Sequence, residues 1–190
     1  KFNFNNFALE SEINLVNLSI LNNQNLKIFF PDLNKSAQLL NHKMLIKFKK
    51  DNLYIDGSGD ILLQKKNDSI SYSINKKKDI YNFSSSLKIR DNPIRLNFFD
   101  YKKDENSVLD LTIEGFKKLD NQTKFNLISL EEKKNKIKVK NLILNKEKQV
   151  IDLDNLSINF EDNEDNINKF DISKKDNNYY LKGPVFNGDR

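Results

Sequence analysis

The sequence contains no cysteine, a single histidine and no apolar run long enough to cross a bilayer. The absence of cysteine excludes a disulfide scaffold and a zinc site with thiolate ligands, and it fits the cytoplasm, the periplasm or the cell surface equally. The absence of a long apolar run excludes a membrane-spanning helix within these residues. The histidine, His42, has no fixed partner in the sequence, so a packing or surface role explains it better than a catalytic one.

Two further patterns lack a part that their chemistry would need. Residues 56–60, Asp-Gly-Ser-Gly-Asp, have the glycines of a phosphate-binding loop but neither its lysine nor its following helix, so they predict a hairpin turn. The acidic residues 161–165 lack the alternate-residue ligand spacing and the turning glycine of a calcium loop, so they predict a solvated turn. We therefore expect no enzyme activity, no cofactor and no metal site.

The charge is nearly balanced, with 32 basic and 27 acidic side chains and a formal net charge of +5. A nucleic-acid-binding protein usually gathers its basic residues on one face. The densest basic cluster here consists of Lys133, Lys134, Lys136, Lys138 and Lys140. The last three alternate with apolar residues, which predicts a solvated outward strand face that also discourages edge pairing. A phosphate track is the weaker interpretation, and we expect no nucleic-acid partner.

Short stretches of alternating polar and apolar residues recur from residue 53 to residue 182, at a spacing of roughly ten to fifteen residues. Turns rich in Lys, Asn and Asp separate them, and no long crossover intervenes, so neighbouring strands should pair antiparallel. The 14 Phe and 6 Tyr argue against disorder. We predict a mainly β fold, a curved antiparallel meander that forms a groove. Residues 1–190 are expected to form one β-rich segment of a longer repetitive protein, without an internal boundary.

Near the start of the chain the pattern predicts other elements. Residues 26–30 are expected to form a short strand that ends at Pro31. Ala37, Leu39, Leu40, Met44 and Leu45 have helical spacing, with Asn34 as the N-cap. One short helix near residues 34–45 is therefore predicted.

An eight-residue frame occurs three times, at residues 13–20, 137–144 and 151–158. In each, two apolar positions alternate with polar ones, an Asn follows, and two more apolar positions continue the alternation. The Asn adds one residue to the period of two, and a β-bulge would absorb it. Leu142 would then return to the face of Val139, and the strand would bend. Asn suits this place because it tolerates left-handed backbone angles.

These frames, the meander of short strands and the end of the chain resemble the AsmA-like family of bacterial envelope proteins, in particular its long YhdP- and TamB-type members. The end, residues 179–189, is similar to the family's strand, glycine and step into a helix, although Asn187 stands where an Asp is more usual. The resemblance covers mainly residues 92–190. It implies a periplasmic protein that is anchored in the inner membrane by sequence outside this chain.

The resemblance further implies a curved sheet that lines an apolar groove for phospholipid acyl chains, in transport or in outer-membrane assembly, with possible envelope protein partners. Burial of each acyl methylene would gain about 0.8 kcal/mol. The residues expected to line the groove are Leu111, Ile113, Phe125, Leu127, Val139, Leu142, Leu153, Leu156, Ile158 and Phe160.

Alternation alone leaves two alternatives open. The same apolar face would also fit an ordinary core, packed against a second sheet or a helix. A structural or adhesive surface β-domain, a solenoid or sandwich that binds protein or glycan, is therefore the alternative function.

Overall fold

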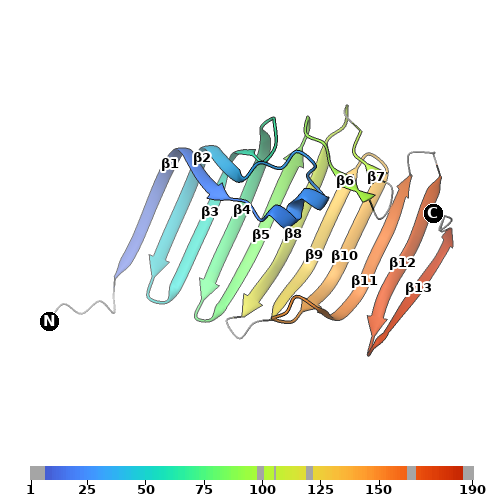
Figure 1. Cartoon of the computed structure of the whole chain (residues 1–190). Coiled ribbons are helices and arrows are strands. Elements are labelled where there is room, and N and C mark those ends of the chain that lie inside the picture. Colours follow the sequence, from blue (N-terminus) through green and yellow to red (C-terminus); the bar gives the residue numbers. More distant parts are fainter. Residues whose placement is uncertain (1–6, 98–100, 105, 119–121, 162–165, 186–190) are drawn as a thin grey trace.

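The computed structural model describes residues 7–97, 101–104, 106–118, 122–161 and 166–185. Eleven strands form one antiparallel sheet that is not closed into a barrel, in the order β1-β2-β3-β4-β5-β8-β9-β10-β11-β12-β13 (Figure 1). The prediction of a mainly β, curved antiparallel meander is confirmed. The strands of this sheet are β1 (Ala8–Leu21), β2 (Ser36–Lys49), β3 (Asn52–Leu62), β4 (Asp68–Lys77), β5 (Ile80–Ile89), β8 (Leu109–Lys118), β9 (Thr123–Glu132), β10 (Asn135–Leu144), β11 (Val150–Glu161), β12 (Ile167–Lys175) and β13 (Asn178–Val185).

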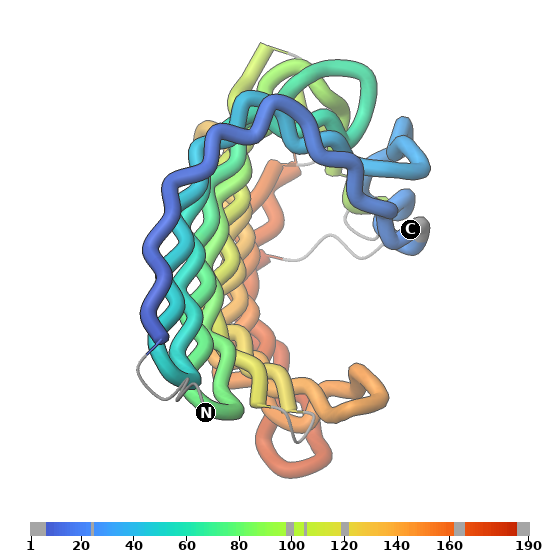
Figure 2. The backbone as a smooth tube through the Cα atoms, turned by 90° about the vertical axis from the view of Figure 1, so that its left-hand side faces the viewer, coloured from blue at the N-terminus to red at the C-terminus, as the bar shows by residue number. Residues whose placement is uncertain are grey.

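The sheet is bent into a trough, whose C-shaped section is seen in Figure 2. Two small elements lie on its concave side: the 3-10 helix η2 (Gln24–Ile28), and a hairpin of β6 (Arg95–Leu96) and β7 (Tyr101–Lys102) (Figure 1). Asn23 caps η2, because its side chain accepts a hydrogen bond from the Asn25 backbone N–H at 3.1 Å. Residues 26–30, predicted to be a strand, therefore lie partly in this helix, and that prediction is wrong.

The hydrophobic core lies between the concave face and these two elements, at one end of the strands. Phe30 and Leu33 reach it from the segment around η2, and Ile94 and Tyr101 reach it from the hairpin region. We call this part of the concave face the covered half. Its buried cluster consists of Phe30, Leu33, Ala37, Leu39, Ile61, Leu63, Leu87, Ile89, Ile94, Tyr101, Leu109, Ile158, Phe160 and Phe170.

The extra residue predicted by the repeated frame is present. Val139 pairs with Leu156, and Leu142 pairs with the buried Leu153, so both lie on the concave face although two residues separate them. Asn141, between them, has a φ of 49°, the left-handed conformation expected of Asn at this position. The same insertion in β11 separates Leu153 from Leu156 and shifts the register with β12. The prediction of an extra residue that restores the apolar face is confirmed.

The helix predicted at residues 34–45 is wrong, because these residues form most of β2. Asn41 has a φ of 53° and interrupts the register with β3 between Leu40 and Lys43. This irregularity returns Met44 to the concave face of Leu39, while Leu40 and Leu45 lie on the convex face. The resulting spacing imitates a helical period.

The hairpin predicted at residues 56–60 is also wrong, because these residues lie inside β3. The two glycines are required by side chains of the neighbouring strands. A Cβ atom on Gly57 would lie 2.5 Å from Cζ of Tyr72, and one on Gly59 would lie 2.5 Å from Cδ2 of His42. Glycine within a strand therefore marks a close approach here and not a turn.

Candidate functional site

The other half of the concave face, which we call the open half, is apolar but lacks a cover from η2 or the β6–β7 hairpin (Figure 1). It contains a hollow of about 420 Å³ near the ends of β4 and β8 and the start of β5. Strand alternation directs Ile74 of β4 and Tyr81 and Phe83 of β5 into this hollow, and these side chains are only half-buried. Lys117 and Lys118 of β8 complete the lining. The hollow therefore joins apolar walls to cationic side chains.

Two phenylalanines next to Gly115 form one side of the open half. Phe83 is opposite Gly115 on β5, and Phe125 is opposite it on β9. The two rings make an edge-to-face contact, with centroids 5.8 Å apart and planes at 71°. A Cβ atom on residue 115 would lie 2.9 Å from Cζ of Phe83, so only glycine allows this packing. The site thus depends on one small residue between two large ones.

Lysines lie at the strand ends of the open half. Tyr81 is flanked across the sheet by Lys76 of β4 and Lys117 of β8. The Lys76 ammonium lies 5.6 Å from the Tyr81 ring centroid, a cation–π distance. This arrangement can hold an apolar chain along the walls and an anionic or polar end group near the lysines.

His42 and Tyr72 lie on the concave face between the two halves. His42 is 1% exposed, its Nε2 lies 2.9 Å from the Asp60 carbonyl oxygen, and its Nδ1 lies 3.5 Å from the Tyr72 hydroxyl oxygen. The two rings stack with centroids 5.8 Å apart. Burial, followed by the nearby Asp56 charge, raises the pKa of Tyr72. His42 therefore packs against the neighbouring strands with two defined partners, in agreement with the packing role expected from the sequence.

The structure divides the ten predicted groove residues among three places. Ile113, Phe125, Val139 and Leu142 are half-buried and lie outside the core cluster, and Leu153 is buried opposite Leu142. The residues in or against the core cluster of the covered half are Leu111, Leu156, Ile158 and Phe160. Whether any of them contacts lipid stays a prediction.

Leu127 does not lie on the concave face, and its placement in the groove is wrong. It pairs with Glu114 of β8 and Lys140 of β10, and both of those side chains are exposed on the convex face. Asn126 is an extra residue in β9, which breaks the register with β8. Ile128, opposite Val139, therefore takes the concave position.

Three residues of the hollow, Ile74, Tyr81 and Phe83, were missed by the sequence-based prediction of the site. The signal was present, because residues 70–89 alternate as regularly as the three frames do. The family resemblance, which covers mainly residues 92–190, does not extend to these residues.

The lysine cluster of residues 133–140 lies partly along β10, and four of its five side chains are paired with carboxylates. Lys136 and Lys138 lie 3.0 and 3.2 Å from the Glu131 carboxylate, and Lys133 lies 2.5 Å from that of Asp104. Lys134 pairs with Glu161. Hydrogen bonds from Lys136 and Ser129, with a further one from Lys138, lower the pKa of Glu131 to about 2. The prediction that Lys136, Lys138 and Lys140 form an outward strand face is confirmed by their register.

This pKa predicts a pH dependence of stability. A carboxyl group whose pKa is lowered by folding stabilises the folded chain above its usual pKa, and this contribution is lost as the pH falls toward the folded value. The free energy of unfolding should therefore decrease between about pH 4.5 and pH 2, and Glu131→Gln should reduce that decrease. Urea titrations across this range would measure it. Glu147→Gln, in an exposed turn, is the control, and an equal effect of both variants would contradict the assignment.

In the described part of the chain, no helix is long and apolar enough to span a membrane. Within the same residues, no group of three or more His, Asp or Glu side chains is placed to hold a metal ion.

Comparisons of the chain with protein-family models, with curated proteins and with solved structures each gave no match.

Proposed function

We propose that the chain is a segment of a periplasmic, inner-membrane-anchored protein whose trough shields phospholipid acyl chains, for phospholipid transport or outer-membrane assembly. The observation that supports this is the contrast between the two halves of the concave face. The covered half has its own apolar cover from η2 and the hairpin region, whereas the open half presents half-buried apolar side chains around a hollow of about 420 Å³. The cellular location and the membrane anchor depend on the resemblance to AsmA-like proteins.

The energetics favour an acyl chain in the open half. Each methylene moved from water onto an apolar surface gains about 0.8 kcal/mol. Even an acyl chain that is only partly covered by the open half would therefore gain binding free energy. The convex face stays wet, because exposed Ser, Asn, Asp and Lys side chains alternate with the concave positions. Lys76 and Lys117 at the strand ends match the negative charge of a phospholipid phosphate.

Photo-crosslinking in cells tests this proposal. A benzoylphenylalanine at position 83 keeps an aromatic ring in the open half, and one at position 116 places the same probe on the convex face. Phe116 is a matched control, because it is half-buried and opposite Asn82, the residue preceding Phe83. Phospholipid attached at position 83 and not at position 116, identified by mass spectrometry, is the expected result.

Crosslinks from position 83 to protein alone would show that another polypeptide covers the open half. Equal lipid attachment at both positions would show only general membrane proximity. Either outcome would count against the lipid trough.

A second candidate, a surface β-domain that binds glycan, is favoured by a different observation on the convex face. Hydroxyl side chains lie opposite one another across four strands: Ser58 on β3, Ser71 on β4, Ser86 on β5 and Thr112 on β8. They line a shallow hollow of about 390 Å³ together with the carboxylates of Asp56 and Glu114, a surface suited to hydrogen bonding with sugars. Glycan binding by the chain, without lipid attachment at position 83, would favour this candidate.

A further inference from the structure

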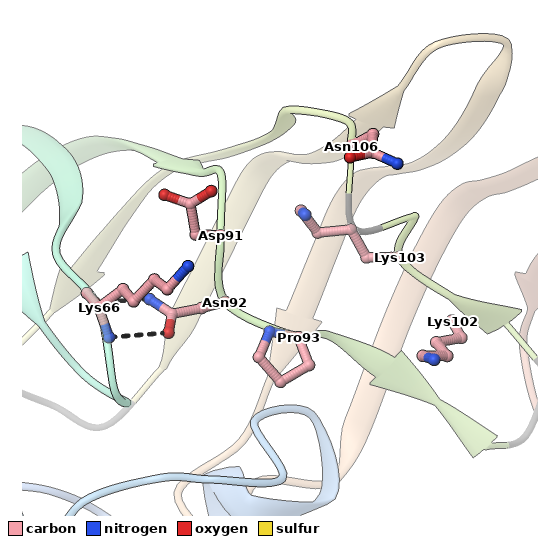
Figure 3. A pocket seen from close by; sticks show the side chains of 7 residues that line it. All are labelled: Lys66, Asp91, Asn92, Pro93, Lys102, Lys103 and Asn106. Atoms are coloured by element: carbon pink, nitrogen blue, oxygen red, sulfur yellow. Dashed lines mark hydrogen bonds between the residues drawn. The ribbon is translucent and has the colours of Figure 1, made fainter.

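A polar hollow of about 340 Å³ lies where three loops meet, at the covered end of the sheet (Figure 3). The loops follow β3, β5 and β7. The residues that line the hollow are Lys66, Asp91, Asn92, Pro93, Lys102, Lys103 and Asn106. Three lysines and one aspartate make the lining positive.

The wall of this hollow is fixed by a buried amide. Asn92 is 1% exposed; its Nδ2 donates to the Lys66 carbonyl at 2.6 Å and to the Asp68 carboxylate at 2.7 Å. Its Oδ1 accepts a hydrogen bond from the Lys66 N–H at 3.1 Å. Asp68 in turn accepts from the Arg90 N–H at 3.1 Å. The backbone that carries Lys66 is thus held in place, whereas its side chain is exposed.

The carboxylates of Asp68 and Asp104 interact electrostatically with the buried lysine of the hollow. Lys103 is 2% exposed, and its ammonium donates to two carbonyl oxygens, those of Arg90 and, at 2.9 Å, Asp104. Among the ion pairs of the described residues, none includes Lys103. An ammonium whose hydrogen bonds go to only two carbonyl oxygens keeps one further N–H donor. An anion in the hollow would accept a hydrogen bond from it.

We propose that this hollow binds a phosphate group. Figure 3 shows the Lys66 and Lys103 side chains pointing toward each other across the hollow, with the Asn106 amide beside them. Two ammonium groups and an amide supply donors for phosphate oxygens, and the buried position of Lys103 strengthens its interaction with an anion. Asp91 reduces the positive charge of the hollow but does not cancel it. The inference is independent of the lipid-shielding role of the open half.

Titration of the isotope-labelled chain with inorganic phosphate tests the proposal. Backbone amide signals of residues 66, 92 and 106 should shift and saturate, and sodium chloride at matched ionic strength should not reproduce this. Lys66→Gln should weaken binding about tenfold, because one charge-assisted contact is lost. Lys65→Gln is the matched control, since the neighbouring Lys65 pairs with Asp32 at 3.0 Å and does not line the hollow. Asp91→Asn should strengthen binding, because it removes the negative charge.

Co-sedimentation with phosphatidylglycerol vesicles distinguishes the source of the phosphate group. Sedimentation that free phosphate competes away, and that Lys66→Gln weakens, would identify a lipid headgroup as the ligand. Saturable shifts at the three amides without vesicle binding would identify a soluble phosphate compound. No saturable shift at these amides, or equal losses in Lys66→Gln and Lys65→Gln, would overturn the proposal.

Discussion

Replacing Glu132 with alanine is expected to lower the free energy of unfolding by about 3–5 kcal/mol. Glu132 ends β9, is 2% exposed and accepts three hydrogen bonds from β7 and the segment that follows it. The donors are the Tyr101 hydroxyl, the Ser107 hydroxyl and, at 2.8 Å, the Asp104 backbone N–H. Removal of the carboxylate would leave these donors without an acceptor in a site that water cannot easily enter.

The effect should extend to the cover of the trough. Tyr101 is 3% exposed and makes an edge-to-face contact with Phe160, with ring centroids 6.3 Å apart. Burial and then the Glu132 carboxylate raise the pKa of Tyr101, so this hydroxyl stays a donor at any ordinary pH. Without Glu132, the hairpin region would lose its main polar attachment to the sheet, and the core beneath it would be exposed.

Urea unfolding followed by far-ultraviolet circular dichroism would measure the change. Glu114→Ala is the matched control, because Glu114 is an exposed carboxylate on the adjacent strand β8 and its loss should cost less than about 0.5 kcal/mol. A similar small change for both variants would show that Glu132 does not hold the hairpin region on the sheet.

The face of each strand could be predicted from the sequence where the period of two was intact. In β5, the alternate residues Tyr81, Phe83, Leu87 and Ile89 lie on one face, as a period of two predicts. Where an extra residue interrupts the period of two, the residues that follow it change face, so their faces can be predicted only if the sequence marks the insertion. In residues 137–144 the repeated frame marks the insertion at its Asn. In β9, Phe125 and Leu127 fit a period of two, so alternation places Leu127 on the concave face, whereas the extra residue Asn126 places it on the convex face.

The cover of the groove could not be predicted, because alternation shows which side of a strand is apolar but not what lies against it. The covering side chains of Leu26, Phe30 and Ile94 come from the short helix η2 and from segments without regular secondary structure. The contact between His42 and Tyr72 could not be predicted from local sequence patterns either. Their places depend on glycines of the strand between them, which only the pairing of three strands brings together. Most of the acidic turn, residues 162–165, and the end of the final motif, residues 186–190, lie outside the described residues, whereas residues 179–185 of that motif lie in β13.

Replacing Gly115 with alanine is expected to lower the free energy of unfolding by about 2–3 kcal/mol. The added Cβ would lie 2.2 Å from the Lys124 carbonyl oxygen and 3.1 Å from the Phe125 Cα, so backbone atoms would have to move. The site lies beside the register shift between β8 and β9, where the two strands approach closely.

The sign of this change is informative, because Gly→Ala at a site with enough space usually stabilises a protein by about 0.4–1 kcal/mol. Urea unfolding of Gly115→Ala would be compared with that of Ser84→Ala, an exposed convex position opposite Glu114 that should change by less than about 0.5 kcal/mol. Stabilisation by Gly115→Ala would show that β8 and β9 lie farther apart than described. Destabilisation would support the close approach that places Phe83 and Phe125 against each other in the open half.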